Sequence, residues 1–184
     1  MITILALGDS LTAGYGLLPE DSFASRLERA LGDEGRDVAV INGGVSGDTA
    51  HDGLYRLDPL LERNPDLVIV EFGANDIYQR LPEDEVMDNL EMIIDKCRAI
   101  GAEVLLTGVL SLRDPDQEYN TRFHDIYQEL SRTKQIPLVP DFIPGIPGNP
   151  DLTLPDGIHP NVAGVDVIVD NILPAVRLLL DKNS

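Results

Sequence analysis

The stretch LALGDSLTAGYG, residues 5–16, joins an apolar run to a turn of small and polar residues. With the preceding residues 2–4, the run has the length and apolar character of a buried β-strand. Two interpretations of the turn are open. Gly8-Asp9-Ser10 could simply close the strand, which is the commoner role of such a tripeptide, or Ser10 could be a nucleophile displayed at the end of the strand.

Similar apolar runs recur along the chain, separated by segments whose apolar residues have helical spacing. We expect further strands near residues 37–41, 67–70, 104–106 and 137–139. We expect helices near residues 21–31, 49–62, 84–99, 119–132 and 161–180, the second being interrupted or ended near Pro59. Strands this apolar are buried on both faces, where right-handed crossovers place helices. The pattern predicts an α/β fold, a three-layer α/β/α sandwich with a parallel sheet, as one domain over residues 1–184.

Composition excludes several classes of function. A formal net charge of −18 opposes binding to nucleic acid, and no apolar run approaches the roughly 20 residues that a membrane span needs. The only cysteine, Cys97, allows neither a disulfide framework nor a thiolate metal site. The start MITILAL shows no signal peptide, so we expect a cytoplasmic protein, or a periplasmic or secreted one if a signal was removed. Nothing in the sequence indicates the oligomeric state.

Four loops carry the residues of chemical interest, and three of them directly follow predicted strands. They are residues 8–12, 42–49, 73–76 and 156–161. In parallel sheets ligands bind outside the carboxyl ends of the strands, where such loops meet. Together the loops supply a hydroxyl, a carboxylate three residues before an imidazole, glycine-flanked N–H groups and a primary amide. These are the groups that acyl transfer requires.

Each loop also has a structural explanation of its own. Asp156 and His159 could form a turn before a proline that starts a helix, and the stretches around Asp48 and Asn75 could be helix caps. Neither the Gly-x-Ser-x-Gly elbow nor the phosphate-binding loop that ends in lysine is matched. The structural explanations do not account for four such loops at the same end of one sheet. We therefore favour a catalytic site.

The blocks GDSLTAGYG, SGDTA, GAND and DGIHPN occur in this order along the chain. In these blocks the sequence resembles the GDSL esterases of the SGNH hydrolase superfamily, and is most similar to the branch of bacterial arylesterases, acyl-CoA thioesterases and lysophospholipases. The resemblance covers essentially the whole chain. It implies a flavodoxin-like, five-stranded parallel sheet, no metal or organic cofactor, and hydrolysis of carboxylic esters or thioesters.

The resemblance also assigns roles position by position. The nucleophile of the family falls on Ser10, its base on His159 and its acid on Asp156, while its oxyanion donors fall on Gly47 and Asn75. The chemistry is consistent, because a serine hydroxyl needs a neighbouring base and the carboxylate fixes the imidazole tautomer. The backbone N–H of Ser10 is a third donor for the oxyanion, beside the N–H of Gly47 and the amide of Asn75.

The substrate is less clearly indicated. Directly after Asn75 lies the segment IYQRLP, residues 77–82, and we expect its apolar residues Ile77, Tyr78 and Leu81 to line the acyl side and to move on binding. An equally good interpretation makes it a surface connection that packs on the core. Tyr15 is expected to border the site from the first loop. The expected partner is a small acyl ester or thioester.

Two other functions remain open at this point. A carbohydrate acetylesterase would use the same catalytic residues. A flavin carrier on the same topology would use glycine-rich loops at the carboxyl edge of the sheet, but it has no need of the Asp156 and His159 pair.

Overall fold

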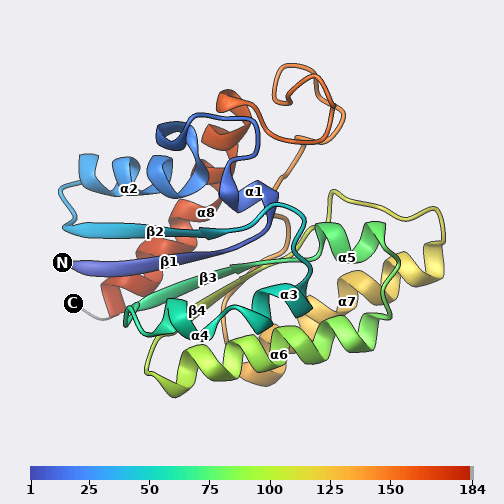
Figure 1. The fold of residues 1–184 in the computed structure, drawn as a ribbon, viewed down its shortest axis with the longest axis horizontal. Helices are drawn as coiled ribbons and strands as arrows, with labels where there is room; N and C mark the ends of the chain where they lie inside the picture. The colour runs from blue at the N-terminus through green and yellow to red at the C-terminus, as the bar shows by residue number, and fades with distance from the viewer. Residues whose placement is uncertain (183–184) are drawn as a thin grey trace.

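A five-stranded parallel sheet forms the centre of the protein (Figure 1). The computed structural model describes residues 1–182. The strands are β1 (Ile2–Gly8), β2 (Val38–Gly44), β3 (Leu67–Glu71), β4 (Glu103–Thr107) and β5 (Leu138–Val139), in the order β2-β1-β3-β4-β5. The predicted fold class is therefore confirmed, and the sheet has the five strands that the family resemblance implies.

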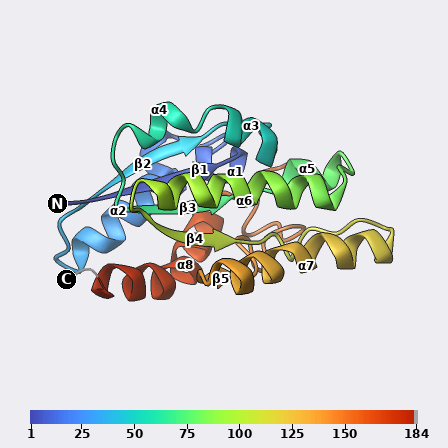
Figure 2. The same ribbon diagram turned by 90° about the horizontal axis from the view of Figure 1, so that it is seen from below.

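Helices cover both faces of this sheet. The helices α2 (Phe23–Asp33) and α8 (Val162–Lys182) pack together on one face. The other face carries α3 (Ala50–Tyr55), α4 (Asp58–Leu61), α6 (Glu83–Ala99) and α7 (Gln117–Lys134), as Figures 1 and 2 show. This division follows from right-handed crossovers on a sheet whose order reverses direction after β2. All five residues of β3 are buried, as expected for a strand covered on both sides.

The segment 49–62 forms two helices rather than one. The interruption comes at Arg56 and Leu57, and Pro59 lies in the first turn of α4. Proline lacks an N–H group but is tolerated in a first turn, where that group has no helical partner. Pro59 therefore starts the second helix instead of ending the first.

Capping side chains set two other helix starts that differ from the predictions. The helix α2 begins at Phe23, because Ser22 accepts a hydrogen bond from the backbone of Ser25. A short 3₁₀ turn, Pro19–Asp21, precedes it. The helix α7 begins at Gln117, two residues earlier than predicted, because the carboxylate of Asp116 caps its first turn.

The carboxyl ends of the strands point to one edge of the molecule, which carries the short helices α1 (Ser10–Ala13), α3 and α5 (Ala74–Tyr78) (Figure 1). The long connection between β5 and α8 passes over the same edge. The predicted loops therefore lie at one end of the sheet. Within residues 1–182, none of the helices combines the length and apolar character that crossing a membrane requires.

Candidate active site

Ser10 lies at the sharp turn where β1 ends, as the first residue of the one-turn helix α1. The side chain of Asp9 caps this helix by accepting a hydrogen bond from the N–H of Leu11, at 2.9 Å. Gly44, at the end of β2, passes directly beneath the turn. A Cβ on Gly44 would lie 2.2 Å from the backbone nitrogen of Ala13. The turn that presents Ser10 therefore rests on bare backbone of the neighbouring strand.

The imidazole of His159 lies between Ser10 and Asp156. Its Nε2 is 3.0 Å from Ser10 Oγ and its Nδ1 is 2.5 Å from Asp156 Oδ2. The other carboxylate oxygen, Oδ1, accepts hydrogen bonds from the backbone N–H groups of Ile158 and His159, at 2.9 and 3.0 Å. The N–H of Ile158 and then the imidazole hold the pKa of Asp156 below its usual range. Asp156 is thus an ionised acceptor that fixes the ring of His159.

A small antiparallel turn holds the histidine in place. Thr153 and Pro160 form an antiparallel bridge, and the N–H of Leu154 donates to the carbonyl of His159 at 2.8 Å. On the outer side the ring of Tyr15 packs on the imidazole, with 4.4 Å between ring centroids. Tyr15 is therefore a neighbour of the base, and its own ring is half exposed.

The predicted oxyanion donors come from two adjacent loops. The amide Nδ2 of Asn75, in α5, donates to the carbonyl of Asp48 at 2.8 Å and to Asp9 Oδ2 at 3.3 Å. Gly47, next to Asp48, has a φ of 93°, a left-handed conformation that favours glycine. Apart from Gly47 and its two chain neighbours, no atom of the described chain lies within 4 Å of where a Cβ of Gly47 would be. Backbone conformation, rather than crowding within the protein, thus requires glycine at this position.

An apolar cavity of about 240 Å³ opens beside these groups. Its walls are Ser10, Leu11, Ala74, Asn75, Tyr78, Leu112, Ile143, Ile158 and His159. The serine, the imidazole and the amide therefore share one cavity with aliphatic and aromatic side chains. Such an arrangement suits a substrate with an apolar group attached to a reactive carbonyl.

The comparisons with known proteins agree with this geometry. The sequence model of the GDSL-like lipase/acylhydrolase family matches residues 6–167. This chain belongs to that family. The family resemblance stated from the four sequence blocks is thereby confirmed, and the chain is a hydrolase of carboxylic esters.

Three similar proteins illustrate the relationship. An arylesterase from Vibrio mimicus is 40% identical over 158 residues, which cover 85% of this chain and 79% of that protein. Thioesterase 1/protease 1/lysophospholipase L1 from Escherichia coli K12 is 33% identical over 184 residues, 99% of this chain and 86% of that protein. The structure of the psychrotrophic esterase EstA from Pseudoalteromonas sp., inhibited by monoethylphosphonate, has a TM-score of 0.90 and 32% identity, covering 97% and 98% of the two chains. These names favour neither a flavin carrier nor a carbohydrate acetylesterase.

In this GDSL hydrolase the segment of residues 77–82, which was expected to line the acyl side, only partly reaches the cavity. Tyr78 lines the cavity, but Ile77 and Leu81 are not among its walls. Ile77 is 2% exposed and belongs to the core, and Leu81 packs against that core. Successive residues of a helix point about 100° apart, so Ile77 and Tyr78 in α5 face different surroundings. The expectation that Ile77 and Leu81 line the acyl side is corrected accordingly.

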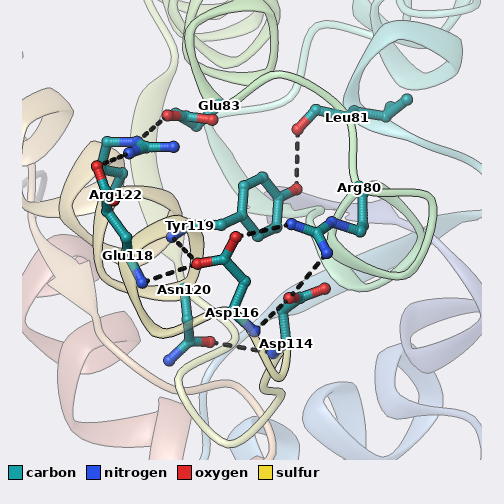
Figure 3. Close-up of polar contacts among 9 residues, drawn as sticks. All are labelled: Arg80, Leu81, Glu83, Asp114, Asp116, Glu118, Tyr119, Asn120 and Arg122. Carbon is teal, nitrogen blue, oxygen red and sulfur yellow. Dashed lines mark hydrogen bonds and ion pairs between the residues drawn. The ribbon is translucent and has the colours of Figure 1, made fainter.

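The end of the same segment is tied to the loop that follows β4, through a set of contacts that we call the Arg80 cluster: Arg80, Asp114, Asp116 and Tyr119 (Figure 3). The guanidinium of Arg80 lies 3.6 Å from Asp114 and 3.0 Å from Asp116, and over the ring of Tyr119. The hydroxyl of Tyr119 donates to the carbonyl of Leu81 at 2.8 Å. Movement of this segment on binding stays a prediction, and it would require these contacts to break.

The helix-cap interpretation is borne out for the loop around Asp48, but it is wrong for the loop around Asn75, because α5 follows Gly73 and no side chain of the described residues caps its start. Thr49 caps α3 in a reciprocal capping box with Asp52. Asp76, 1% exposed, accepts a hydrogen bond from the N–H of Ala50 at 3.1 Å. Burial raises the pKa of Asp76 to about 6. Asp76, next to Asn75, therefore connects α5 to the start of α3.

Sequence reasoning missed several residues of the site. Leu112 lines the cavity from the loop after β4, which the sequence analysis does not place at the site, whereas Ile143 lies in the loop 140–155, which we expect from the sequence to border it. Glu71 lies fully buried at the end of β3, one strand away from the nucleophile. A signal for it existed, because a glutamate directly after Leu67–Val70 is a charged residue in an otherwise apolar run.

Proposed function

We propose that this GDSL hydrolase cleaves esters and thioesters of small to medium acyl groups through an acyl-enzyme on Ser10. The observation that carries the proposal is the hydrogen-bonded series from Ser10 Oγ to His159 Nε2, at 3.0 Å, and from His159 Nδ1 to Asp156 Oδ2, at 2.5 Å. A serine hydroxyl is a weak nucleophile until a neighbouring base accepts its proton. His159 is that base, and Asp156 stabilises the imidazolium that forms.

The first half of the reaction forms the acyl-enzyme. The Oγ of Ser10 attacks the carbonyl carbon of the substrate while its proton passes to His159 Nε2. The carbonyl oxygen becomes an oxyanion, which accepts hydrogen bonds from the backbone N–H groups of Ser10 and Gly47 and from the amide of Asn75. When the tetrahedral intermediate collapses, the bond to the leaving group breaks. The imidazolium then donates its proton to the departing alcohol or thiol.

The second half restores the enzyme. A water molecule gives a proton to His159 Nε2 and attacks the acyl carbon, forming a second tetrahedral intermediate with the same donors. Collapse breaks the bond to Ser10 Oγ, which recovers its proton from the imidazolium. The carboxylic acid leaves, and no atom of the enzyme has been changed.

Asn75 must release one existing contact to serve as a donor. Both hydrogens of its Nδ2 are engaged, one with the Asp48 carbonyl at 2.8 Å and one with Asp9 Oδ2 at 3.3 Å. The contact with Asp9 is the longer and therefore the weaker by geometry. We propose that the oxyanion replaces Asp9 as the acceptor, while the bond to Asp48 holds the amide in place.

The cavity beside Ser10 favours short acyl groups. Its volume of about 240 Å³ is below the range of about 300 to 1,000 Å³ that is usual for ligand pockets. The wall residues Leu11, Leu112 and Ile143 are apolar and buried, so they suit an alkyl chain rather than a sugar. The name of the Escherichia coli relative supports including thioesters among the substrates.

Covalent labelling combined with a substrate panel tests the proposal. A fluorophosphonate should label the wild type at Ser10, and Ser10→Ala should abolish both labelling and turnover of p-nitrophenyl esters. Ser46→Ala is the matched control, because Ser46 is an exposed serine on the neighbouring loop, and it should keep both. Turnover should fall as the acyl group lengthens beyond the cavity. Labelling at another residue, or turnover that survives Ser10→Ala, would refute the assignment.

A further inference from the structure

Two carboxyl groups lie buried together beneath the turn of residues 8–12 that presents Ser10, which we call the nucleophile turn. Asp9 and Glu71 are both 0% exposed, and Glu71 stands opposite Gly8 in the pairing of β1 with β3. Glu71 Oε2 accepts hydrogen bonds from the backbone N–H of Asp9 at 3.2 Å and from the hydroxyl of Thr12 at 2.8 Å. Its other oxygen, Oε1, is buried and receives no hydrogen bond from the described residues. An ionised carboxylate would be costly in such a place.

The nucleophile turn is shaped around Glu71. A Cβ on Gly8 would lie 2.2 Å from Thr12 Oγ1 and 2.4 Å from Glu71 Oε2. The glycine that precedes Asp9-Ser10 is therefore needed because the carboxyl group of Glu71 occupies the space where a side chain would be. Glu71 thus contacts the turn at two places, because its carboxyl group packs against Gly8 and accepts a hydrogen bond from Thr12.

Asp9 connects Glu71 to the predicted oxyanion donor. Its Oδ1 accepts from the N–H of Leu11 at 2.9 Å and its Oδ2 accepts from the amide of Asn75 at 3.3 Å. Its carboxyl group also lies within hydrogen-bonding reach of that of Glu71. One side chain thus touches the nucleophile turn, the amide of Asn75 and the second carboxyl group.

The surroundings favour a shared proton. Burial raises the pKa of Asp9 to about 7 and the pKa of Glu71 well above its usual range, and the charge of Asp9 raises the pKa of Glu71 further. Asp76 and Asp48 add negative charge near Asp9. The nearby cation, Arg56, binds Asp48 at 2.5 Å and the carbonyl of Gly8 at 3.0 Å.

The remaining titratable groups near the pair do not replace this proton. Tyr127 and Tyr78 have pKa values raised by burial and by these acids, so they are neutral neighbours. The hydroxyl of Tyr127 donates to the carbonyl of Phe72 at 2.8 Å. His159 faces Ser10 and Asp156. The proton that relieves the repulsion must therefore reside on the two carboxyl groups themselves.

We propose that Glu71 is a positioning residue of this hydrolase, whose neutral carboxyl group donates its proton to the carboxylate of Asp9 and so leaves one negative charge beneath the nucleophile turn. The part that concerns catalysis rests on the proposed function, because it takes Asn75 as an oxyanion donor. When the shared proton is lost, a second negative charge develops near the place where the oxyanion forms. That charge opposes the oxyanion and holds the amide of Asn75 more firmly on Asp9.

Infrared spectroscopy tests the proton without reference to activity. At pH 8, above the pKa values of about 7 for Asp9 and about 6 for Asp76, the wild type should show the carbonyl stretch of a buried, protonated carboxyl group, and Glu71→Gln should lack that band. Asp114→Asn is the control, because Asp114 is another buried carboxyl group that contacts Arg80 and not this pair. It should keep the band. A spectrum that is unchanged in Glu71→Gln would overturn the proposal, whether or not the protein hydrolyses esters.

The dependence of kcat/KM on pH tests the effect on catalysis. In the wild type we expect kcat/KM for p-nitrophenyl acetate to fall on the alkaline side by about tenfold for each pH unit, as one proton is lost. Glu71→Gln keeps a neutral donor of the same size, so its alkaline fall should disappear, whereas Asp114→Asn should keep it. Glu71→Ala should lower kcat by about 10- to 100-fold through misplacement of the turn, with the rate recovered in Glu71→Gln. An alkaline fall that persists unchanged in Glu71→Gln would refute the catalytic part.

Discussion

Two clusters of acidic side chains lie at the same edge of the sheet and behave in opposite ways. In the Arg80 cluster two carboxylates meet a guanidinium, and the side chains of Arg80 and Asp116 are 53% and 46% exposed. In the buried pair, Asp9 and Glu71 are both 0% exposed, and the backbone N–H of Asp9 donates to Glu71 Oε2. Carboxyl groups thus form ion pairs with Arg80 in one cluster, whereas in the other they share a proton.

The pKa directions of the two clusters show what causes this difference. The backbone N–H of Tyr119 and then Arg80 lower the pKa of Asp116. Burial raises the pKa values of Asp9 and Glu71, and the charge of Asp9 raises the pKa of Glu71 further. Water and counter-charge, rather than the type of residue, therefore decide whether an acid in this protein is ionised. Changes to the buried pair and its partners should also have larger effects than changes to the Arg80 cluster.

The largest effect should come from the amide that contacts the buried pair. Asn75→Ala removes one oxyanion donor, so kcat should fall by about 10² to 10³ with little change in KM. Steady-state kinetics with p-nitrophenyl acetate measures both constants. Asn89→Ala, at a half-buried position of α6 where the amide donates to the carbonyl of Glu85, should leave both constants unchanged. A raised KM with normal kcat would make Asn75 a binding residue instead.

An intermediate effect is expected on the free energy of unfolding, whose pH dependence should change in opposite directions in Glu71→Gln and in Asp116→Asn. Burial raises the pKa of Glu71 well above its usual range, so its contribution to stability is fully present below the usual range of a glutamate and is lost progressively as pH rises above it. Glu71→Gln removes this titration and keeps Asp9, so between pH 5 and pH 8 its free energy of unfolding should rise relative to that of the wild type, by at most about 1.4 kcal/mol for each pH unit. Urea unfolding at the two pH values measures the difference.

Asp116 supplies the contrast in the same experiment. Its pKa is lowered, so its contribution is present at neutral pH and is lost as pH falls below the usual range of an aspartate. Asp116→Asn should consequently be less stable than the wild type at pH 7, and the difference should shrink in acid. If both variants shifted in the same direction with pH, the contrast between the two clusters would be wrong.

The smallest effect should follow from removing the guanidinium of the Arg80 cluster. Exposed ion pairs contribute at most about 1 kcal/mol, so Arg80→Ala should reduce the free energy of unfolding by no more than that. Arg122→Ala is the matched control, since Arg122 pairs with Glu83 and Glu118 on the same surface (Figure 3). A loss of several kcal/mol in Arg80→Ala alone would show that its cluster acts like a buried one.

The sequence predicts the sheet and the catalytic loops well because both depend on local pattern. Near-continuous apolar runs specify buried parallel strands, and the loops around Ser10, Asn75 and His159 carry their chemistry in adjacent residues. Helix starts were less accurate, because the caps at Ser22 and Asp116 lie outside the apolar periodicity. The predicted interruption near Pro59 is confirmed, but it comes at Arg56 and Leu57, because a first turn tolerates proline.

The features that could not be predicted depend on contacts between distant segments. Glu71 gains its role from Gly8 and Asp9, which are more than 60 residues away in the chain. Whether Ile77 or Tyr78 faces the cavity depends on how α5 packs against the rest of the protein. This helix has only five residues, too few for its pattern of apolar residues to show which side faces the cavity. The loop residues Leu112 and Ile143 become cavity walls only once β4 and β5 have brought them to the same edge.

The hydrogen bond between Ser10 and His159 joins residues that are 149 positions apart. While the polypeptide is being synthesised, the nucleophile emerges with the first strand, but its base follows only after all five strands. Contacts of such long sequence separation form late and slowly. Ester hydrolysis is therefore the last property that the growing chain acquires, and the appearance of activity during refolding should report the completed molecule rather than the early sheet.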